Sequence, residues 1–214
     1  MYSVKEAFYT LQGEGARAGR ASVFCRFTGC NLWSGRERDR ATSHCRFCDT
    51  DFVGTDGQNG GRFENAQALA THLMSLWPHA QEAAVPYVVF TGGEPLLQLD
   101  TPLIEAMHAQ GFEIAVETNG TLTPPDGIDW LCVSPKGDAT LRITQGDELK
   151  LVFPQSDAMP EHFTHLAFRH FFLQPMDLAP RGGRGTTMED TVSYCLDHPQ
   201  WRLALQTHKI AGID

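Results

Sequence analysis

Three of the six cysteines lie in one polar stretch, and their spacing is the first feature with chemical meaning. Cys45 and Cys48 form a Cys-x-x-Cys pair, and Cys30 precedes them by fourteen intervening residues. A structural zinc site normally closes with four Cys or His ligands, so zinc would need a fourth donor such as His44. A four-iron cluster can also be held by three thiolates, which leaves its fourth iron free for another ligand, although most clusters use four cysteines. The spacing therefore indicates either zinc or an iron–sulfur cluster with an open position.

The other three cysteines carry no such signal. Cys25 and Cys132 sit in apolar segments and Cys195 in an expected helix, and none has a second cysteine at ligand spacing. Free cysteine commonly behaves as a small buried hydrophobic residue. We expect these three to belong to the core rather than to a metal site.

The composition indicates one globular domain over residues 1–214. With 214 residues and 42% hydrophobic residues, the chain is long enough to bury a core without disulfides. Its net charge of −9 argues against a broad nucleic-acid surface, which needs clustered Lys and Arg. No nucleic-acid partner is therefore expected.

Targeting signals are not evident in the sequence. The start, MYSVKEAF, lacks the basic and apolar run of a signal peptide, and no apolar stretch reaches the roughly 20 residues that span a bilayer. We expect a cytoplasmic protein without a membrane partner. In that compartment reduced thiols bind metals or do chemistry more often than they form disulfides.

The apolar pattern predicts strands that alternate with helices. Helices are expected over 63–77, 101–111 and 187–198, the last with Thr187 as its cap, and 55–62 reads as a loop. Extended segments are expected over 4–15, 21–29, 86–95, 112–120, 128–136, 147–153, 170–177 and 201–209.

This α/β alternation favours a mostly parallel sheet. Too few helices are expected for eight full βα units, so the predicted fold is an incomplete, open (β/α) barrel of the TIM type. An open doubly wound sheet is the alternative.

Polar groups recur where the expected strands end. They are Gly93-Glu94, Glu117–Asn119, Ser134–Lys136, Gln174–Asp177 and His208. In parallel α/β folds the carboxyl edge of the sheet is where ligands bind and chemistry occurs. Five polar clusters directed to one mouth favour an enzyme over solvated loop ends.

With TGGEP at 91–95, the cysteine stretch resembles the radical S-adenosylmethionine superfamily. More narrowly, the chain resembles the 7-carboxy-7-deazaguanine synthase family in YTLQGEG, FCRFTGCNLWSG, CRFCDTDF, VETNG, VSPK, LQPMD and QTHK, which follow in order from Tyr9 to Lys209. Most superfamily members have three residues between the first two cysteines. The fourteen found here occur in a branch of this synthase family.

The resemblance implies a [4Fe–4S] cluster on Cys30, Cys45 and Cys48, in a cluster loop of residues 30–50, with S-adenosylmethionine on the open iron. Lys136 would suit a carboxylate of that cofactor, and Gly92-Gly93 would let the backbone approach it closely. Alternatively, these are a solubilising lysine and an ordinary turn. The implied cofactor-binding residues are Phe47, Asp49, Gly92, Gly93, Glu94, Glu117, Asn119, Ser134, Pro135 and Lys136.

The family substrate is 6-carboxy-5,6,7,8-tetrahydropterin. Arg26 interrupts an apolar strand, where a charge must be paired or serve a ligand. The resemblance makes it a clamp on the substrate carboxylate, and an ion pair with a buried Asp or Glu is the structural alternative. Glu14 and Arg26 join the three cysteines as implied catalytic residues. The implied substrate-binding residues are Leu11, Gln12, Gly13, Glu14, Arg26, Thr91, Gln174, Pro175, Met176, Asp177, His208 and Asp214, the last through its α-carboxylate.

Thr50 follows the cysteine pair in the sequence CDT. The resemblance implies that its hydroxyl binds Mg²⁺, an ion that prefers oxygen ligands and keeps few protein ones. The plain alternative is a turn residue bonded to neighbouring backbone.

The implied reaction removes hydrogen from C6 of the pterin, contracts the ring, releases ammonia and yields 7-carboxy-7-deazaguanine, with a flavodoxin or ferredoxin as reductant. A homodimer is expected because an open barrel needs its edge covered. Two rivals stand beside this interpretation. One is a radical enzyme that activates a protein glycine, and the other is a zinc-stabilised binding module.

Overall fold

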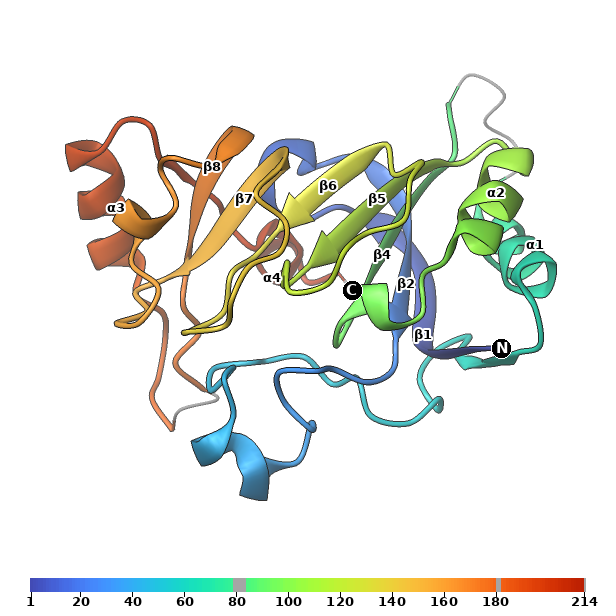
Figure 1. The fold of residues 1–214 in the computed structure, drawn as a ribbon, viewed down its shortest axis with the longest axis horizontal. Coiled ribbons are helices and arrows are strands. Elements are labelled where there is room, and N and C mark those ends of the chain that lie inside the picture. The colour runs from blue at the N-terminus through green and yellow to red at the C-terminus, as the bar shows by residue number, and fades with distance from the viewer. Residues whose placement is uncertain (79–83, 180–181, 214) are drawn as a thin grey trace.

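The computed structural model describes residues 1–78, 84–179 and 182–213, and its strands form one nine-stranded sheet (Figure 1). The spatial order is β3-β1-β2-β4-β5-β6-β7-β8-β9. The strands are β1 (Tyr2–Leu11), β2 (Ala21–Phe27), β3 (Gly61–Phe63), β4 (Tyr87–Gly92), β5 (Glu113–Thr118), β6 (Trp130–Val133), β7 (Gln145–Phe153), β8 (Ala167–Pro175) and β9 (Arg202–Leu203).

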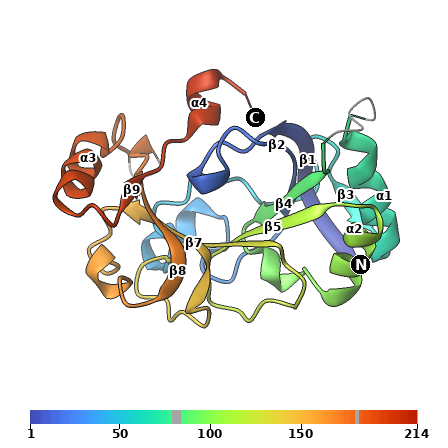
Figure 2. The same ribbon diagram turned by 90° about the horizontal axis from the view of Figure 1, so that it is seen from above.

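From β2 onward the neighbours β2, β4, β5, β6, β7, β8 and β9 are parallel and follow chain order, while β1 pairs antiparallel with both β2 and β3. A doubly wound sheet would reverse its strand order at a switch point. This sheet instead proceeds in one direction and curves, and it does not close (Figure 2). The predicted open barrel with mostly parallel strands is confirmed.

The core lies on the helix-covered side of the sheet. Val88, Phe90, Ile114 and Val116 of β4 and β5 are fully buried against the helical layer. Their alternation with Val89 and Ala115, which are buried on the opposite face, gives the continuous apolar runs typical of parallel strands.

The helices α1 (Ala66–Leu76) and α2 (Thr101–Ala109) pack together at one end of the sheet (Figure 1). The expected helix over 63–77 is wrong at its start. Asn65 caps α1 by accepting from Ala68 N at 2.9 Å. Phe63 lies in β3, where it pairs with Tyr2 of β1. Gly61 and Arg62, expected in a loop, therefore belong to β3.

At the other end of the sheet lies α3 (Met188–Asp197) (Figure 1). Thr187 holds its N-cap position as predicted, but the hydroxyl donates to the carbonyl of Phe153 instead of capping the helix. Of the cysteines assigned to the core, Cys25 and Cys132 are buried and Cys195 is half-buried.

The expected last strand over 201–209 is wrong for most of its length. Only Arg202 and Leu203 pair with β8. The chain then leaves the sheet and forms the short helix α4 (Thr207–Ala211), which lies in the opening of the barrel near the turn after β1 (Figure 2). Thr207 fixes it there by donating from both its N–H and its hydroxyl to the carbonyl of Gly13. Hydrogen bonds to the turn after β1 therefore hold this segment in place of the expected strand pairing.

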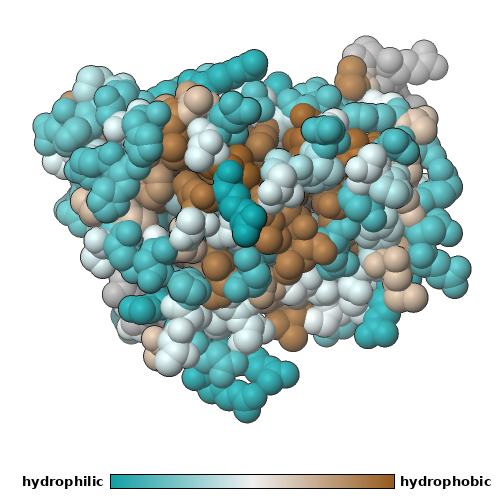
Figure 3. Space-filling view, viewed as in Figure 1, coloured by the Kyte–Doolittle hydropathy of each residue, from teal (hydrophilic) through white to brown (hydrophobic). Residues whose placement is uncertain are grey.

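The cluster loop of residues 30–50 projects beyond the sheet and contains one 3-10 helix, η2 (Glu37–Thr42) (Figure 1). The face in Figure 3 is mostly hydrophilic, with hydrophobic residues gathered at its centre over β5 to β7. Within the described ranges, every helix is too short or too polar to cross a membrane.

Candidate active site

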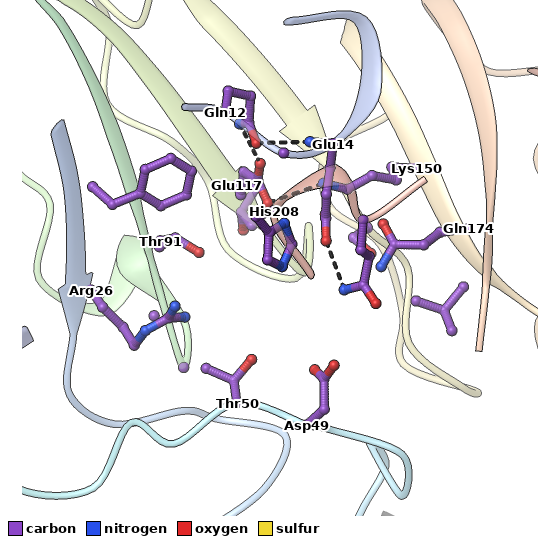
Figure 4. Close-up of a pocket in the computed structure, with 18 of the residues that line it drawn as sticks. Gln12, Glu14, Arg26, Asp49, Thr50, Thr91, Glu117, Lys150, Gln174 and His208 are labelled. Carbon is purple, nitrogen blue, oxygen red and sulfur yellow. Dashed lines mark hydrogen bonds and ion pairs between the residues drawn. The ribbon is translucent and has the colours of Figure 1, made fainter. Parts of the chain in front are cut away.

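A cavity of about 440 Å³ occupies the inside of the barrel (Figure 4). This volume lies within the range of small-molecule sites. Because β1 runs antiparallel to β2, its carboxyl end at Leu11 lies beside the amino end of β2 at Ala21. The turn after β1 therefore closes the far end of the cavity. The residues that line it are Glu6, Phe8, Leu11, Gln12, Gly13, Glu14, Phe24, Arg26, Asp49, Thr50, Asp51, Thr91, Gly92, Gly93, Glu117, Thr118, Asn119, Ser134, Lys136, Lys150, Val152, Gln174, Gln206, His208 and Lys209.

Lys150 is the centre of the charged network in this cavity (Figure 4). Its side chain is 5% exposed, and its ammonium donates to Glu14 and, at 3.1 Å, to Glu117. The other oxygens of these carboxylates accept from Gln206 and Gln12, each at 2.9 Å. One buried lysine thus holds two carboxylates together from the turn after β1 and from β5.

This network fixes the charge of Glu14. Burial alone raises the pKa of that carboxyl, but the charge and hydrogen bond of Lys150, with the bond from Gln206, outweigh burial and lower it to about 2. Burial disfavours the charged form of Lys150 as well and so lowers its pKa. The neighbouring charges of Glu117 and Glu14 outweigh burial and raise the pKa of Lys150 well above its ordinary value. The cavity therefore holds an ionised acceptor, Glu14, that suits a ligand with N–H groups.

The sequence reading overlooked Lys150, Gln206 and the aromatic pair Phe8 and Phe24. Lys150 carried the same signal as Arg26, a charge inside an apolar strand. Phe8 and Phe24 are partners across β1 and β2, and their rings stack with centroids 5.8 Å apart. No local pattern marks such residues, because only the curvature of the sheet turns them toward the cavity.

Arg26 forms the ion pair that the structural alternative expected, and it also lines the cavity. Its Nε donates to Glu6 at 2.7 Å, so it forms an ion pair across β1 and β2. The guanidinium also lines the cavity, on the side of Thr50 and Thr91 (Figure 4). An arginine held by one carboxylate and still facing the cavity is arranged to bind an anionic ligand group.

The three motif cysteines gather beside this cavity. Cys30, Cys45 and Cys48 share one cluster with the apolar Leu32 and Phe52. A hydrogen bond from Cys45 lowers the pKa of Cys48 to about 6 although burial opposes it, which favours the thiolate form that a metal or cluster binds. Cys48 also lines a second, more open cavity that shares Asp49, Thr50, Asp51 and Lys209 with the first.

His44 does not join these thiols. Its Nδ1 lies 2.7 Å from Asp138, and the ring is more than half exposed. In the described part of the chain, no group of three or more His, Cys, Asp or Glu side chains is arranged to hold a single metal ion. A four-iron cluster makes no such demand, since its thiolates bind different irons. His44, the fourth donor that a zinc site would need, is engaged with Asp138 instead.

The TGGEP turn is shaped by its packing. Gly92 has φ 143°, and a Cβ on Gly93 would lie 2.1 Å from the carbonyl oxygen of Gly29, just before Cys30. Glu94 is fully buried away from the cavity, and its carboxylate accepts from the hydroxyl of Thr118 and the N–H groups of Asn119 and Leu96. These bonds make Glu94 a support for the cavity wall.

Gln174 and His208, two of the expected substrate-binding residues, also line the cavity. Gln174 is buried, and its Oε1 has no hydrogen-bond partner among the described residues, so it presents an acceptor for a ligand donor. His208 lies over Gly13, where a Cβ would come within 2.1 Å of its Nδ1. The expected strand-end position of His208 is wrong, since α4 carries it into the cavity.

Near the cysteines, Ser134 and Lys136 line the cavity, and the Lys136 ammonium donates to the Ser134 carbonyl and hydroxyl. Thr50 lines both cavities. Three soft thiols beside polar oxygen and nitrogen groups fit an iron–sulfur cluster with a bound amino-acid cofactor, and the Thr50 hydroxyl fits the oxygen preference of Mg²⁺.

Several expected residues lie outside the cavity wall. Phe47 packs with the cluster loop, Asp177 lines only the second cavity, and Pro135, Pro175 and Met176 are buried next to lining residues. Asp214 lies outside the described residues.

The fold and the site together define a class: an open α/β-barrel enzyme with a charged interior cavity and a three-thiol loop at its rim. A 7-carboxy-7-deazaguanine synthase from Bordetella pertussis is 66% identical over 212 residues, which are 99% of each chain. A protein of the same name from Caulobacter vibrioides is 61% identical over 212 residues, again 99% of each chain. The chain belongs to the 7-carboxy-7-deazaguanine synthase family.

The fold has a solved counterpart in the crystal structure of QueE from Escherichia coli. The two superimpose with a TM-score of 0.68 at 23% identity, covering 95% of this chain and 93% of that chain. No protein-family model matches the chain.

Proposed function

We propose that this chain converts 6-carboxy-5,6,7,8-tetrahydropterin to 7-carboxy-7-deazaguanine and ammonia, a step of queuosine-type deazapurine synthesis, with residues 1–214 acting as one domain. The observation that carries the proposal is the placement of the three-thiol loop directly beside a cavity with paired carboxylates at one end and Arg26 on its wall. Two relatives named 7-carboxy-7-deazaguanine synthase, which are 66% and 61% identical to this chain, support it.

The residues divide the work by their chemistry. Glu14 and Gln12 offer acceptors and donors to the amide-like edge of the pterin, and Arg26 offers N–H donors to its carboxylate. Each such buried group would cost about 1–3 kcal/mol if left unpaired, so the cavity discriminates by hydrogen bonding. Phe8 and Phe24 exclude water beside these groups.

The cofactors belong to the side of the cavity near the cluster loop. Cys30, Cys45 and Cys48 would hold a [4Fe–4S] cluster, and Ser134 and Lys136 would bind the carboxylate end of S-adenosylmethionine. When bound, these groups would supply the one-electron chemistry needed to remove hydrogen from C6 of the substrate. Thr50 would hold Mg²⁺ against the substrate.

The proposal extends to partners. A flavodoxin or ferredoxin would reduce the cluster, and the protein would act in the cytoplasm. A homodimer would cover the unpaired edge of the open barrel. Sedimentation equilibrium at micromolar concentration tests this point, and a mass of one chain would contradict it.

The reaction is tested after anaerobic loading of the chain with iron and sulfide. Reductant, S-adenosylmethionine, Mg²⁺ and the tetrahydropterin are added, and 7-carboxy-7-deazaguanine is sought by mass spectrometry with Cys45→Ala as control. Product that disappears in the control supports the substrate and the cluster. Release of 5′-deoxyadenosine without product would retain radical chemistry but reject the substrate. Bound zinc with neither product would reject the whole proposal.

A further inference from the structure

The four lysines of this chain, Lys5, Lys136, Lys150 and Lys209, all lie at or beside the cavity. Lys136, Lys150 and Lys209 line it, and Lys5 binds the segment that follows Cys48. The other cationic side chains are arginines and histidines. Lysine is thus used here for specific contacts and not as general surface charge.

Lys209 joins the cluster loop to the barrel. It extends from α4, and its ammonium lies 2.9 Å from Asp49 and 3.0 Å from Asp177. Asp49 directly follows Cys48, while Asp177 lies just beyond β8. A single side chain therefore connects the C-terminal helix, the cluster loop and the end of a barrel strand.

Lys5 holds the segment that directly follows the cluster loop. Its side chain in β1 is 10% exposed, and its ammonium contacts Asp51 at 2.9 Å, Asp56 at 2.8 Å and the carbonyl of Val53 at 3.0 Å. Three acceptors occupy the three N–H donors of the ammonium. A buried lysine saturated in this way is fixed in position.

These contacts flank Thr50. Lys209 binds the residue before it and Lys5 the residue after it, and the segment from Cys48 to Asp51 has no helix or strand of its own. The ion pairs of Lys5 and Lys209 thus hold this segment in place of the backbone hydrogen bonds of a helix or strand. Thr50 faces both cavities from the middle of this segment.

The helix that carries Lys209 is itself held by polar contacts. α4 has no buried residue. Gln206, just before it, donates to Glu14, and Thr207 donates to the carbonyl of Gly13. Through Lys209, these contacts connect the cluster loop to the turn that forms the far end of the cavity.

We propose that Lys5 and Lys209 are positioning residues, a two-lysine clamp that fixes the segment from Cys48 to Asp51 and holds the Thr50 hydroxyl at the cavity mouth. The clamp itself depends only on the contacts above, whereas its effect on Mg²⁺ rests on the proposed function. Lys209 is the more exposed member, and so its removal is expected to loosen the segment without unfolding the chain.

The clamp is tested by hydrogen exchange of the full-length chain without added metal. Lys209→Met is expected to speed exchange of the amides of Val53 and Gly29, which donate to Asp51 and to the carbonyl of Phe52. The expected increase is roughly three- to tenfold, the range for losing a partly exposed ion pair and its charged hydrogen bonds. Lys209→Arg should restore most of the protection. Arg169→Met removes another exposed ion pair, to Asp147, and should leave these amides unchanged. Equal exchange in Lys209→Met and the parent would overturn the proposal.

Lys5→Met is a second variant, expected to speed exchange of the same amides. After loading with cluster and cofactor, Lys209→Met should raise the Mg²⁺ concentration for half-maximal turnover several-fold more than it lowers kcat, with rescue by Lys209→Arg. Faster exchange with an unchanged Mg²⁺ requirement would keep the clamp and reject Thr50 as the Mg²⁺ ligand. If the loaded parent makes no product, the proposed function fails while the exchange result still decides the clamp.

Discussion

Replacing Lys150 by Met should be the most informative single change in the cavity. Lys150 is 5% exposed and Glu14 14% exposed, and methionine keeps most of the length of the side chain while removing its charge. The substitution leaves Glu14 and Glu117 as two neighbouring carboxylates without their shared cation. Breaking a buried ion pair from one side typically costs ~3–5 kcal/mol, because the remaining charge stays buried.

The pKa of Glu14 gives an independent magnitude. Lys150 and Gln206 overcome burial and lower it from 4.5 to about 2, and a tenfold change in proton affinity is worth ~1.4 kcal/mol. The ionised form therefore gains about 3 kcal/mol of stability. Because the folded-state pKa is depressed, this contribution is complete above about pH 4.5 and disappears as the pH falls toward 2.

Denaturant unfolding at pH 7 and at pH 3 measures both quantities. At pH 7 the free energy of unfolding of Lys150→Met should be about 3 kcal/mol below that of the parent, and the difference should shrink at pH 3. Adding Glu14→Gln should recover part of the loss, since it removes one unpaired charge. A loss below about 0.5 kcal/mol at pH 7, or fully additive effects in the double variant, would refute this account of the network.

Three further changes separate support from binding. Glu94→Gln should destabilise the fold by about 1–3 kcal/mol, because the new amide donor would face the N–H of Asn119; an unchanged Tm would contradict this. Arg26→Lys should raise the KM for the tetrahydropterin about tenfold with a smaller change in kcat, and an unaltered KM would remove Arg26 from the substrate site. Arg20→Lys loses a two-point contact to Glu113, at the amino ends of the strands, and should lower stability by about 1 kcal/mol yet leave KM unchanged in steady-state kinetics.

The local pattern was sufficient for most of the barrel. Apolar runs such as Tyr87–Gly92 predict buried parallel strands because no polar face is needed. The cysteine spacing and the TGGEP turn marked the site in the same way, since ligand spacing and glycine freedom are properties of short segments. The ion pair of Arg26 could also be predicted, because a charge in an apolar strand requires a partner.

The tertiary structure decided which groups meet. The alternation in 201–209 indicates a strand, but Gln206 and Thr207 find their partners in Glu14 and Gly13, nearly 200 residues earlier, and the chain turns into α4. The same long-range closure brings Lys209 to Asp49. These contacts depend on how far the sheet curves before it stops, and no local window of sequence contains that information.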